Sequence, residues 1–364
     1  MPPLTLMVKP VSGRCNMRCS YCFYAEELAQ RGGEKLPAMT DACLEQLVRR
    51  AMQEAEGRLD LIFQGGEPML AGKAFYRRLL ALERSLPHPQ LSIHHALQTN
   101  GLLLDEEWCD LLREGNFLVG LSLDGTEALH DLHRRTVSGQ GSWRQTLAAA
   151  ALLRKRGVPY NILCVVTEPM AAQGRAVFQA LREHGFLQFI PCLGSLSGER
   201  RLQSESYGRF LVDVFDCYER AFDQGRPVSI RTFDNWLAMA RGLPPESCAM
   251  GGRCGRYYLV EADGSVYPCD FYAVAEWRLG SIREQSFARM ARTEQARRFT
   301  EPLPLPEACR SCPWLLLCRG GCRRDRDLRL DGQLQPCQWC EGYRLFFEQC
   351  GARLQRLADR VYGS

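Results

Sequence analysis

The sequence predicts an α/β fold, an open (β/α)6 partial barrel followed by a smaller, cysteine-rich C-terminal domain. Two observations carry this prediction: apolar β-rich runs alternate with amphipathic stretches of helical length, and cysteines become dense towards the C-terminus. Strands that alternate with helices are typical of parallel βαβ units. Six units are visible in the sequence, too few for a closed eight-fold barrel, so we expect an open one.

The expected strands are short runs of apolar residues. They cover residues 4–8, 59–63, 91–97, 117–123, 161–166 and 187–191. The expected helices cover residues 41–55, 73–85, 105–114, 142–156, 170–184 and 207–222. The helical pattern gives way between residues 224 and 245 to an extended run and a short helix. We therefore expect the barrel to span residues 1–232, and the C-terminal domain, with its terminal helix, to span residues 233–364.

Composition places the chain among ordinary globular proteins. It has 364 residues, 46% of them hydrophobic and 24% charged, enough for one large and one smaller domain. The net charge of +4 is spread thinly and favours neither nucleic acid nor an anionic membrane as a partner. No run approaches membrane-spanning length, and the N-terminus lacks the pattern of a secretory signal. Eighteen cysteines in such a chain favour metal ligation over disulfides, and hence a reducing cytoplasm.

Three cysteines near the N-terminus, Cys15, Cys19 and Cys22, have the spacing C-x3-C-x2-C. A loop of this kind can hold three irons of a 4Fe–4S cube and leave the fourth iron open for a small molecule. The alternative is a zinc knuckle, which needs four protein ligands. No fourth cysteine or histidine lies nearby, and the first histidine is His88. The spacing therefore favours an iron–sulfur cluster over zinc.

Other informative residues follow the expected strands, where parallel barrels place their chemistry. The second strand runs into Gln64-Gly-Gly-Glu-Pro, whose glycines allow backbone to approach a ligand closely. The fourth ends at Ser122, with Arg134 further along, and an arginine fork suits a carboxylate. Cys164 and Cys192 stand inside apolar runs and are expected to be small core residues.

Thiols become dense from Cys248 onward. Residues 257–267 predict a β-hairpin with a glycine-containing turn, enclosed by Cys254 and Cys269. The run Cys309-x2-Cys312-x5-Cys318-x3-Cys322 follows, and then Cys337 and Cys340. The same thiols could build a zinc-ribbon module, but their number favours iron–sulfur clusters.

The N-terminal motif, with Tyr21 before the last cysteine, resembles the signature of radical S-adenosylmethionine (SAM) enzymes. In that superfamily the open iron binds the methionine part of SAM, and reductive cleavage gives a 5′-deoxyadenosyl radical. The resemblance implies that Tyr21 belongs to the SAM site and that Gly66 contacts the methionine amino group. It also implies that Ser122 and Arg134 bind the ribose and carboxylate, and that the Leu193 backbone contacts the adenine.

The C-terminal thiols resemble the twin-cluster SPASM extension of radical SAM proteins. The resemblance assigns the first auxiliary 4Fe–4S cluster to Cys248, Cys254, Cys269 and Cys322. It assigns the second to Cys309, Cys312, Cys318 and Cys340, and leaves Cys337 as a spare. With the N-terminal loop, three 4Fe–4S clusters are expected.

Across nearly its whole length the chain resembles anaerobic sulfatase-maturating enzymes. The likeness rests on Cys-Ser-Tyr-Cys-Phe-Tyr, Phe-Gln-Gly-Gly-Glu-Pro, Leu-Gln-Thr-Asn-Gly, Asn-Ile-Leu-Cys-Val-Val-Thr and Asp-Gly-Ser-Val-Tyr-Pro-Cys-Asp-Phe-Tyr. That family oxidises an active-site cysteine or serine of a sulfatase to Cα-formylglycine. The resemblance implies a radical SAM oxidoreductase whose partners are an unfolded or nascent sulfatase segment and an external low-potential electron donor.

Oxidation of the target residue also needs a base for its thiol or hydroxyl proton. Asp270, next to the expected ligand Cys269, is our candidate, since a carboxylate beside an electron-accepting cluster couples proton loss to electron loss. Tyr24 and Gln64 are weaker candidates for aligning the substrate. Two alternatives stay open: a SPASM enzyme that forms another peptide modification, such as a thioether cross-link, and a ferredoxin-type electron carrier.

Overall fold

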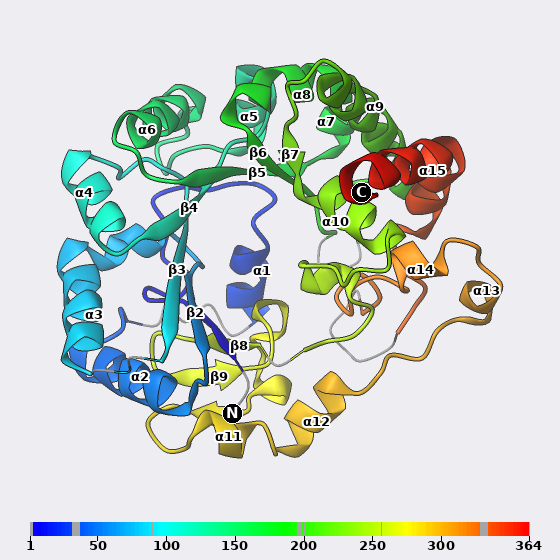
Figure 1. Ribbon diagram of the computed structural model, residues 1–364. Coiled ribbons are helices and arrows are strands. Elements are labelled where there is room, and N and C mark those ends of the chain that lie inside the picture. Colours follow the sequence, from blue (N-terminus) through cyan, green and yellow to red (C-terminus); the bar gives the residue numbers. More distant parts are fainter. Residues whose placement is uncertain are drawn as a thin grey trace. The chain divides into compact units, whose positions relative to one another are not determined.

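The computed structural model describes residues 3–30, 37–86, 88, 90–194, 199, 201–255, 257–327 and 334–363 (Figure 1). The chain folds into two compact units, each built from separate stretches of sequence. The first comprises Met1–Ser122, Arg134–Tyr160 and Arg256–Thr300. The second comprises Leu123–His133, Asn161–Gly255 and Glu301–Ser364.

The first unit is organised around a mostly parallel sheet. Its strands are β1 (Leu4–Val8), β2 (Arg58–Phe63), β3 (Ser92–Thr99), β4 (Phe117–Ser122), β8 (Tyr258–Val260), β9 (Ser265–Tyr267) and β10 (Gly280–Ser281). They lie in the order β10-β9-β8-β1-β2-β3-β4. Strands β1 to β4 pair in parallel, and Leu6, Leu61 and Leu97 are almost fully buried on them.

Helices of the first unit alternate with the parallel strands, as the sequence predicts. They are α1 (Phe23–Gln30), α2 (Asp41–Glu54), α3 (Lys73–Ser85), α4 (Glu106–Glu114), α6 (Trp143–Lys155), α11 (Phe287–Met290) and α12 (Glu294–Thr300). Thr40 caps α2 by accepting from Cys43 N at 3.2 Å, and Asp105 caps α4 by accepting from Trp108 N at 2.8 Å. Such caps satisfy backbone donors that the first helical turn leaves without partners.

The predicted C-terminal hairpin is present and extends the sheet at the free edge of β1. Strands β8 and β9 pair antiparallel, with Leu259 opposite Tyr267. Strand β8 pairs in parallel with β1, with Leu6 opposite Tyr258 and Val8 opposite Val260. This pairing, which the sequence pattern did not predict, brings the segment after β8 close to the segment after β1.

The second unit contains β5 (Tyr160–Val166), β6 (Phe186–Pro191) and β7 (Ser229–Ile230), which pair in parallel. Its helices are α5 (Glu127–His133), α7 (Glu168–Ala171), α8 (Gly174–Leu181), α9 (Ser204–Asp223), α10 (Arg231–Ala240), α13 (Glu307–Arg310), α14 (Leu315–Cys318) and α15 (Cys340–Tyr362). One predicted helix, 170–184, is wrong in its continuity. It breaks after α7 and resumes at Gly174, where a Cβ atom would lie 2.9 Å from Asp213 Cβ, and it ends in a 3-10 turn at Arg182–His184.

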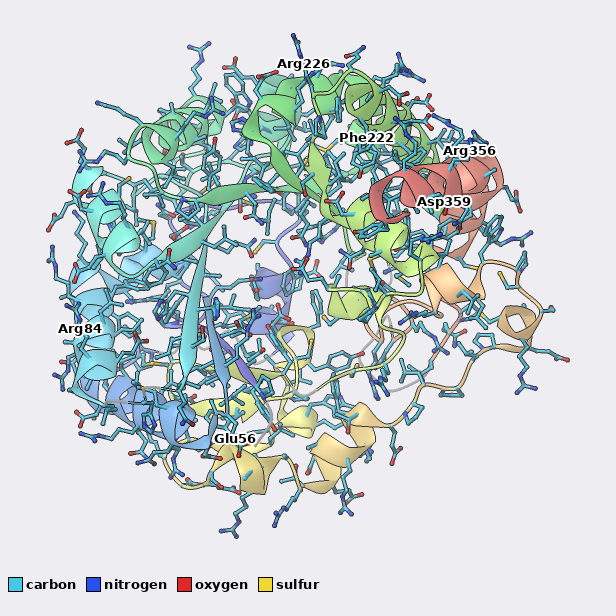
Figure 2. All side chains as sticks on the ribbon, in the orientation of Figure 1. Glu56, Arg84, Phe222, Arg226, Arg356 and Asp359 are labelled. Carbon is cyan, nitrogen blue, oxygen red and sulfur yellow. The ribbon has the colours of Figure 1, made fainter. Side chains whose placement is uncertain are left out.

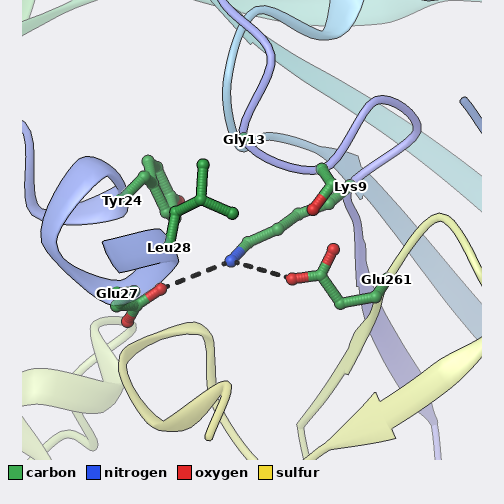
Figure 3. A pocket seen from close by; sticks show the side chains of 7 residues that line it. Lys9, Gly13, Tyr24, Glu27, Leu28 and Glu261 are labelled. Atoms are coloured by element: carbon green, nitrogen blue, oxygen red, sulfur yellow. Dashed lines mark ion pairs between the residues drawn. The ribbon is translucent and has the colours of Figure 1, made fainter. Parts of the chain in front are cut away.

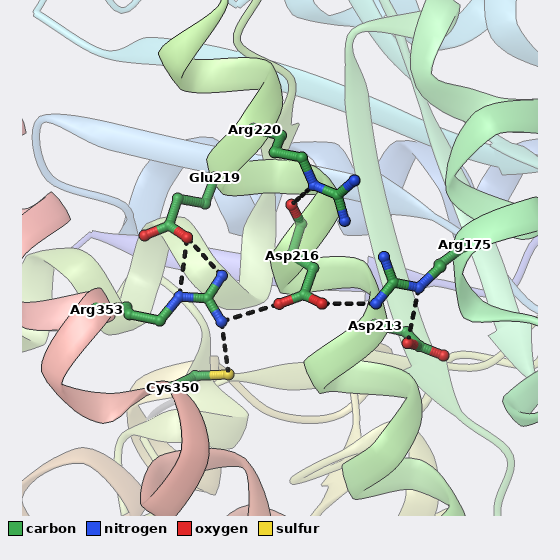
Figure 4. Close-up of polar contacts among 7 residues, drawn as sticks. All are labelled: Arg175, Asp213, Asp216, Glu219, Arg220, Cys350 and Arg353. Carbon is green, nitrogen blue, oxygen red and sulfur yellow. Dashed lines mark hydrogen bonds and ion pairs between the residues drawn. The ribbon is translucent and has the colours of Figure 1, made fainter.

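The long C-terminal helix α15 packs closely on α9. A Cβ atom at Gly342 would lie 2.1 Å from the Ser204 carbonyl oxygen, so the two backbones approach closely only because residue 342 is glycine. Figure 4 shows how Arg353 of α15 donates to Asp216 and Glu219 of α9, and how Asp216 also accepts from Arg175 of α8. Charged side chains elsewhere, such as the labelled Arg84 in Figure 2, lie exposed at the surface.

Candidate active site

The loop with Cys15, Cys19 and Cys22 connects β1 to α1. All eighteen cysteines lie in the described part of the chain, and none forms a disulfide. Burial of the sulfur, opposed by a hydrogen bond from Met17 N and supported by the nearby Glu67, Cys19 and Cys22, raises the pKa of Cys15 to about 12. The effect of Cys19 and Cys22 on Cys15 means that the three thiols lie near one another, and a cationic metal core at this place would stabilise their thiolate forms. The loop therefore fits an iron–sulfur cluster.

The Gln64-Gly-Gly-Glu-Pro segment packs directly on this cysteine loop. The Glu67 backbone N donates to the Arg14 carbonyl oxygen at 2.8 Å. Gly66 has φ +57°, and a Cβ atom there would lie 2.2 Å from Arg14 O and 2.8 Å from Ser12 O. Glycine is thus required both by the left-handed backbone and by the close approach. The loop after β2 and the cysteine loop hold each other in place.

The Glu67 carboxylate is the anchor between these loops and the end of β3. It is 1% exposed and accepts from Met69 N at 3.0 Å, Thr99 Oγ1 at 2.9 Å and Asn100 N at 2.9 Å. Burial raises its pKa to about 7, and those hydrogen bonds and the charge of Arg134 oppose the rise. Asn100 in turn donates to Asn16 Oδ1 at 2.7 Å. The loops after β1, β2 and β3 are therefore joined by buried polar contacts.

Four of the five predicted SAM-binding residues belong to the first unit. Arg134 is 7% exposed, and its Nη1 donates to the Tyr21 hydroxyl at 2.8 Å. Gly66 lies in the loop already described, and Ser122 is the buried last residue of β4. Leu193 belongs to the second unit, two residues after β6 ends. Arg134 and Tyr21 are thus in contact, although 113 residues separate them.

The candidate base and both weaker candidates form one hydrogen-bonded series in the first unit. Gln64 Nε2 donates to the Tyr24 hydroxyl at 2.7 Å, and that hydroxyl donates to Asp270 Oδ2 at 3.1 Å. Cys269 Sγ lies 3.6 Å from Asp270 Oδ1. Burial raises the pKa of Asp270, and the Lys9 charge and the Tyr24 hydroxyl oppose that rise. The structure therefore gathers side chains from α1, the end of β2 and the segment after β9.

The predicted auxiliary ligands divide between the units, with Cys269 in the first and the others in the second. Burial, together with neighbouring Cys340, Cys309 and Cys312, raises the pKa of Cys318 to about 11. Burial likewise raises the pKa of Cys322, which Cys248 and Cys254 also raise. The thiols of the second unit therefore influence one another in two groups, and Cys337 lies near the group that contains Cys318 and Cys340. Cys337 is buried, whereas the predicted ligands are half-buried or exposed.

The described residues contain no group of three or more histidine, cysteine, aspartate or glutamate side chains placed to hold a single metal ion. Nor does any helix among those residues have the length and apolar character needed to cross a membrane.

Sequence reasoning missed the buried lysine beside this site. Lys9 Nζ lies 3.6 Å from Glu27 Oε2 and 3.5 Å from Glu261 Oε1, and all three side chains are nearly inaccessible (Figure 3). With Tyr24 they line a small pocket. The available signal was a lone lysine inside the apolar run Met7-Val-Lys-Pro-Val. We name Lys9, Glu27 and Glu261 the buried charge triad.

Comparison with known proteins identifies the family. Residues 10–172 match the radical SAM superfamily, and residues 248–313 match the iron–sulfur cluster-binding domain called SPASM. The chain is 40% identical to the cysteine-type anaerobic sulfatase-maturating enzyme of Clostridium perfringens, over 99% of this chain and 100% of that protein. The chain belongs to the family of anaerobic sulfatase-maturating enzymes.

Other similarities agree with this assignment. The serine-type anaerobic sulfatase-maturating enzyme of Klebsiella aerogenes is 35% identical over 99% of this chain and 88% of its own length. The solved structure of native anSMEcpe with bound AdoMet and Cp18Cys peptide superposes with a TM-score of 0.94 at 40% identity, covering 99% of this chain and 100% of that one.

These similarities confirm several predictions made from the sequence. The fold is the mixed α/β radical SAM fold with a C-terminal SPASM domain. The chain is a radical SAM enzyme that oxidises a sulfatase cysteine or serine to Cα-formylglycine, and it uses SAM and iron–sulfur clusters. The two alternatives, an electron carrier and a cross-linking enzyme, are therefore not supported.

We expect Gly66→Ala to destabilise the loop after β2 more than an alanine substitution at a glycine with open space around it. The new Cβ meets backbone carbonyls that have no room to move, in addition to the strain of a left-handed residue, about 1–2 kcal/mol. Gly57→Ala is the matched control, because Gly57 also has φ +70° but nothing lies within 4 Å of its Cβ position. The melting temperature and the affinity for SAM, both measured anaerobically, should be lower in Gly66→Ala than in Gly57→Ala. Equal behaviour of the two variants would contradict this account of the loop.

Proposed function

We propose that this enzyme forms Cα-formylglycine at a site in which Asp270 is the base and Tyr24 and Gln64 align the target residue. The observation that carries this proposal is the hydrogen-bonded series Gln64, Tyr24 and Asp270, which lies beside the expected ligand Cys269. A general base must lie within hydrogen-bonding reach of the proton that it takes, and a fixed neighbour keeps it oriented. The Tyr24 hydroxyl orients one oxygen of Asp270 in this way.

The residues of this chain divide the work as follows. When bound, SAM and the clusters supply the radical that removes a hydrogen atom from the target β-carbon, and an acceptor for the electron that leaves afterwards. Asp270 accepts the proton from the target thiol or hydroxyl. Because Asp270 is 6% exposed, bulk water has little access to this carboxylate before the substrate binds. With a cysteine target, water must finally replace sulfur, which leaves as hydrogen sulfide.

Residues for SAM are proposed as the resemblance assigns them. Gly66 contacts the methionine amino group, and Ser122 and Arg134 bind the ribose and carboxylate. Tyr21 belongs to the same site. The Leu193 backbone contacts the adenine. Support comes from Arg134, whose buried guanidinium is already oriented by the Tyr21 hydroxyl at 2.8 Å. An oriented guanidinium loses less freedom when it binds a carboxylate.

Three 4Fe–4S clusters are proposed, each with its own thiols. The N-terminal loop supplies Cys15, Cys19 and Cys22. The first auxiliary cluster takes Cys248, Cys254, Cys269 and Cys322, and the second takes Cys309, Cys312, Cys318 and Cys340. The mutual influence of the thiols within the N-terminal set and within the second auxiliary set supports this assignment.

We also propose the domain boundary at residues 232 and 233, a cytoplasmic location, and an external low-potential electron donor. The peptide partner is an unfolded or nascent sulfatase segment, with cysteine and serine both open as targets. The relative enzyme was solved with a Cp18Cys peptide, which supports binding of an extended segment.

The central experiment is anaerobic incubation of the reconstituted enzyme with SAM, a reductant and one of two sulfatase-type peptides. The peptides differ only in cysteine or serine at the target position. Mass spectrometry reads the product and chromatography reads deoxyadenosine. Formylglycine on at least one peptide supports the proposal, and deoxyadenosine without formylglycine on either peptide contradicts it.

Anaerobic reconstitution should give about twelve irons per chain, four for each cube. Cys340→Ala should lower that number because it removes an assigned ligand. Cys337→Ala is the matched control, since it removes a buried spare thiol nearby and should leave the iron content unchanged. One or two zinc ions in protein purified without oxygen, or iron loss in Cys337→Ala alone, would overturn the assignment.

Asp270→Asn should separate SAM cleavage from product formation. The amide keeps the size of the carboxylate but accepts no proton, so formylglycine should fall by a factor of about 10² to 10⁴, the range usual for a general base. SAM and peptide should still bind, and deoxyadenosine should still form. Asp263→Asn in the turn of the same hairpin is the control, because the hydrogen bonds that Asp263 makes with described residues are to Ser265 in the same turn. Formylglycine at the parent rate in Asp270→Asn would place the base elsewhere.

A further inference from the structure

The buried charge triad has no role in the function proposed so far. Of the lysines that the structure describes, Lys73 is half-buried, Lys155 is exposed and Lys9 is 3% exposed. A buried ion pair gains little stability over apolar residues of similar size. Stability alone is therefore a poor reason for an ammonium group at this position.

The position of Lys9 is set by the sheet. Lys9 follows β1 directly, and its backbone N donates to Val260 O at 2.9 Å, which continues the pairing of β1 with β8. The same strand β8 leads into Glu261, and α1 supplies Glu27. The ammonium group thus lies between a carboxylate from α1 and a carboxylate that follows β8, at 3.6 Å and 3.5 Å. Figure 3 shows it between them.

Lys9 also lies against Tyr24 and against Gly65, the residue after Gln64. Its Nζ lies 4.5 Å from the centre of the Tyr24 ring, within the range of a cation–π contact. Its stem lies against the residue after Gln64: a Cβ atom at Gly65 would be 2.5 Å from Lys9 Cγ and 2.8 Å from Cδ. The loop that carries Gln64 is therefore shaped around the lysine stem, and the Tyr24 ring rests against its ammonium group.

We propose that Lys9 is a positioning residue for formylglycine formation: clamped by Glu27 and Glu261, its ammonium group holds the Tyr24 ring so that the hydroxyl stays between Gln64 and Asp270. Lys9 contacts neither SAM nor the target residue in this proposal and acts through Tyr24. The inference rests on the proposed function, because it assigns a task within the same site.

A double-mutant cycle tests whether Lys9 acts through Tyr24. Lys9→Met keeps the length of the stem and removes the charge, and Tyr24→Phe removes the hydroxyl. Each should lower kcat for formylglycine about tenfold or more, with peptide KM and iron content near the parent values and deoxyadenosine still formed. Because residues that act as one unit are not additive, the double variant should be no slower than Tyr24→Phe alone. Lys9→Arg, which restores the cation, should recover part of the rate.

Lys73→Met is the matched control. Lys73 Nζ also pairs with two carboxylates, Asp105 at 2.7 Å and Glu107 at 2.6 Å, and lies 6.0 Å from the Trp108 ring, but it takes no part in the site. This control should keep the parent kcat. If Lys9→Met leaves too little folded protein, Lys9→Met with Glu27→Gln removes one carboxylate together with the cation and enters the cycle in its place.

The outcomes separate the two proposals. If the parent enzyme makes no formylglycine on either peptide, the proposed function fails, whatever Lys9 does. If the parent enzyme is active and Lys9→Met keeps its kcat, or if the losses of Lys9→Met and Tyr24→Phe multiply in the double variant, Lys9 is not a positioning residue for Tyr24. A rise in peptide KM alone would also overturn the proposal, since it would place Lys9 in peptide binding.

Discussion

The structure of the candidate site depends on β1 being paired on both edges. On one side β1 pairs with β2, which leads to Gln64 and Gly66, and on the other it pairs with β8, which leads to Glu261 and the hairpin. The cysteine loop follows β1 itself. Parallel strands end at the same edge of a sheet. The loops after β1, β2 and β8 are therefore brought together by strand pairing alone, and no ligand is needed to gather them. The short β1–β8 pairing places Glu261 beside Lys9. Asp270 follows the antiparallel strand β9 and meets Tyr24 through their hydrogen bond.

Polar groups in this region are buried at a cost and are satisfied by one another. Glu67 accepts hydrogen bonds from Met69 N, after β2, and from Asn100 N, after β3. Lys9 lies between two carboxylates. Each buried charge would be unfavourable alone, because removal from water penalises the ionised form. Because these charged groups bridge different loops, a substitution in one loop should also alter the position of the neighbouring loop. Rigid placement of this kind suits a site that must shield a reactive intermediate from water.

Much of this organisation could be predicted from the sequence. The alternation of apolar runs located β1 to β6, because buried parallel strands need apolar residues on both faces. The cysteine spacing and the Gly-Gly-Glu-Pro segment identified the site residues because their chemistry is local. Lys9 and Glu27 could not be found in this way. Their burial depends on how α1, β1 and the segment after β8 pack together, and the apolar run around Lys9 does not show which carboxylates pair with it. The break before Gly174 was missed for the same reason, since it is the approach of Asp213 that requires a glycine there.

The first unit is assembled from stretches that are separated along the chain, with its last stretch at Arg256–Thr300. A ribosome releases the chain from the N-terminus, and domains generally fold as their residues emerge. Strand β1 therefore leaves the ribosome long before its neighbour β8 is made, with one edge open. During that interval Lys9 has no Glu261 to pair with, and Tyr24 has no Asp270. The hydrogen-bonded series of Gln64, Tyr24 and Asp270 is complete only after residue 270 of the 364 has been synthesised.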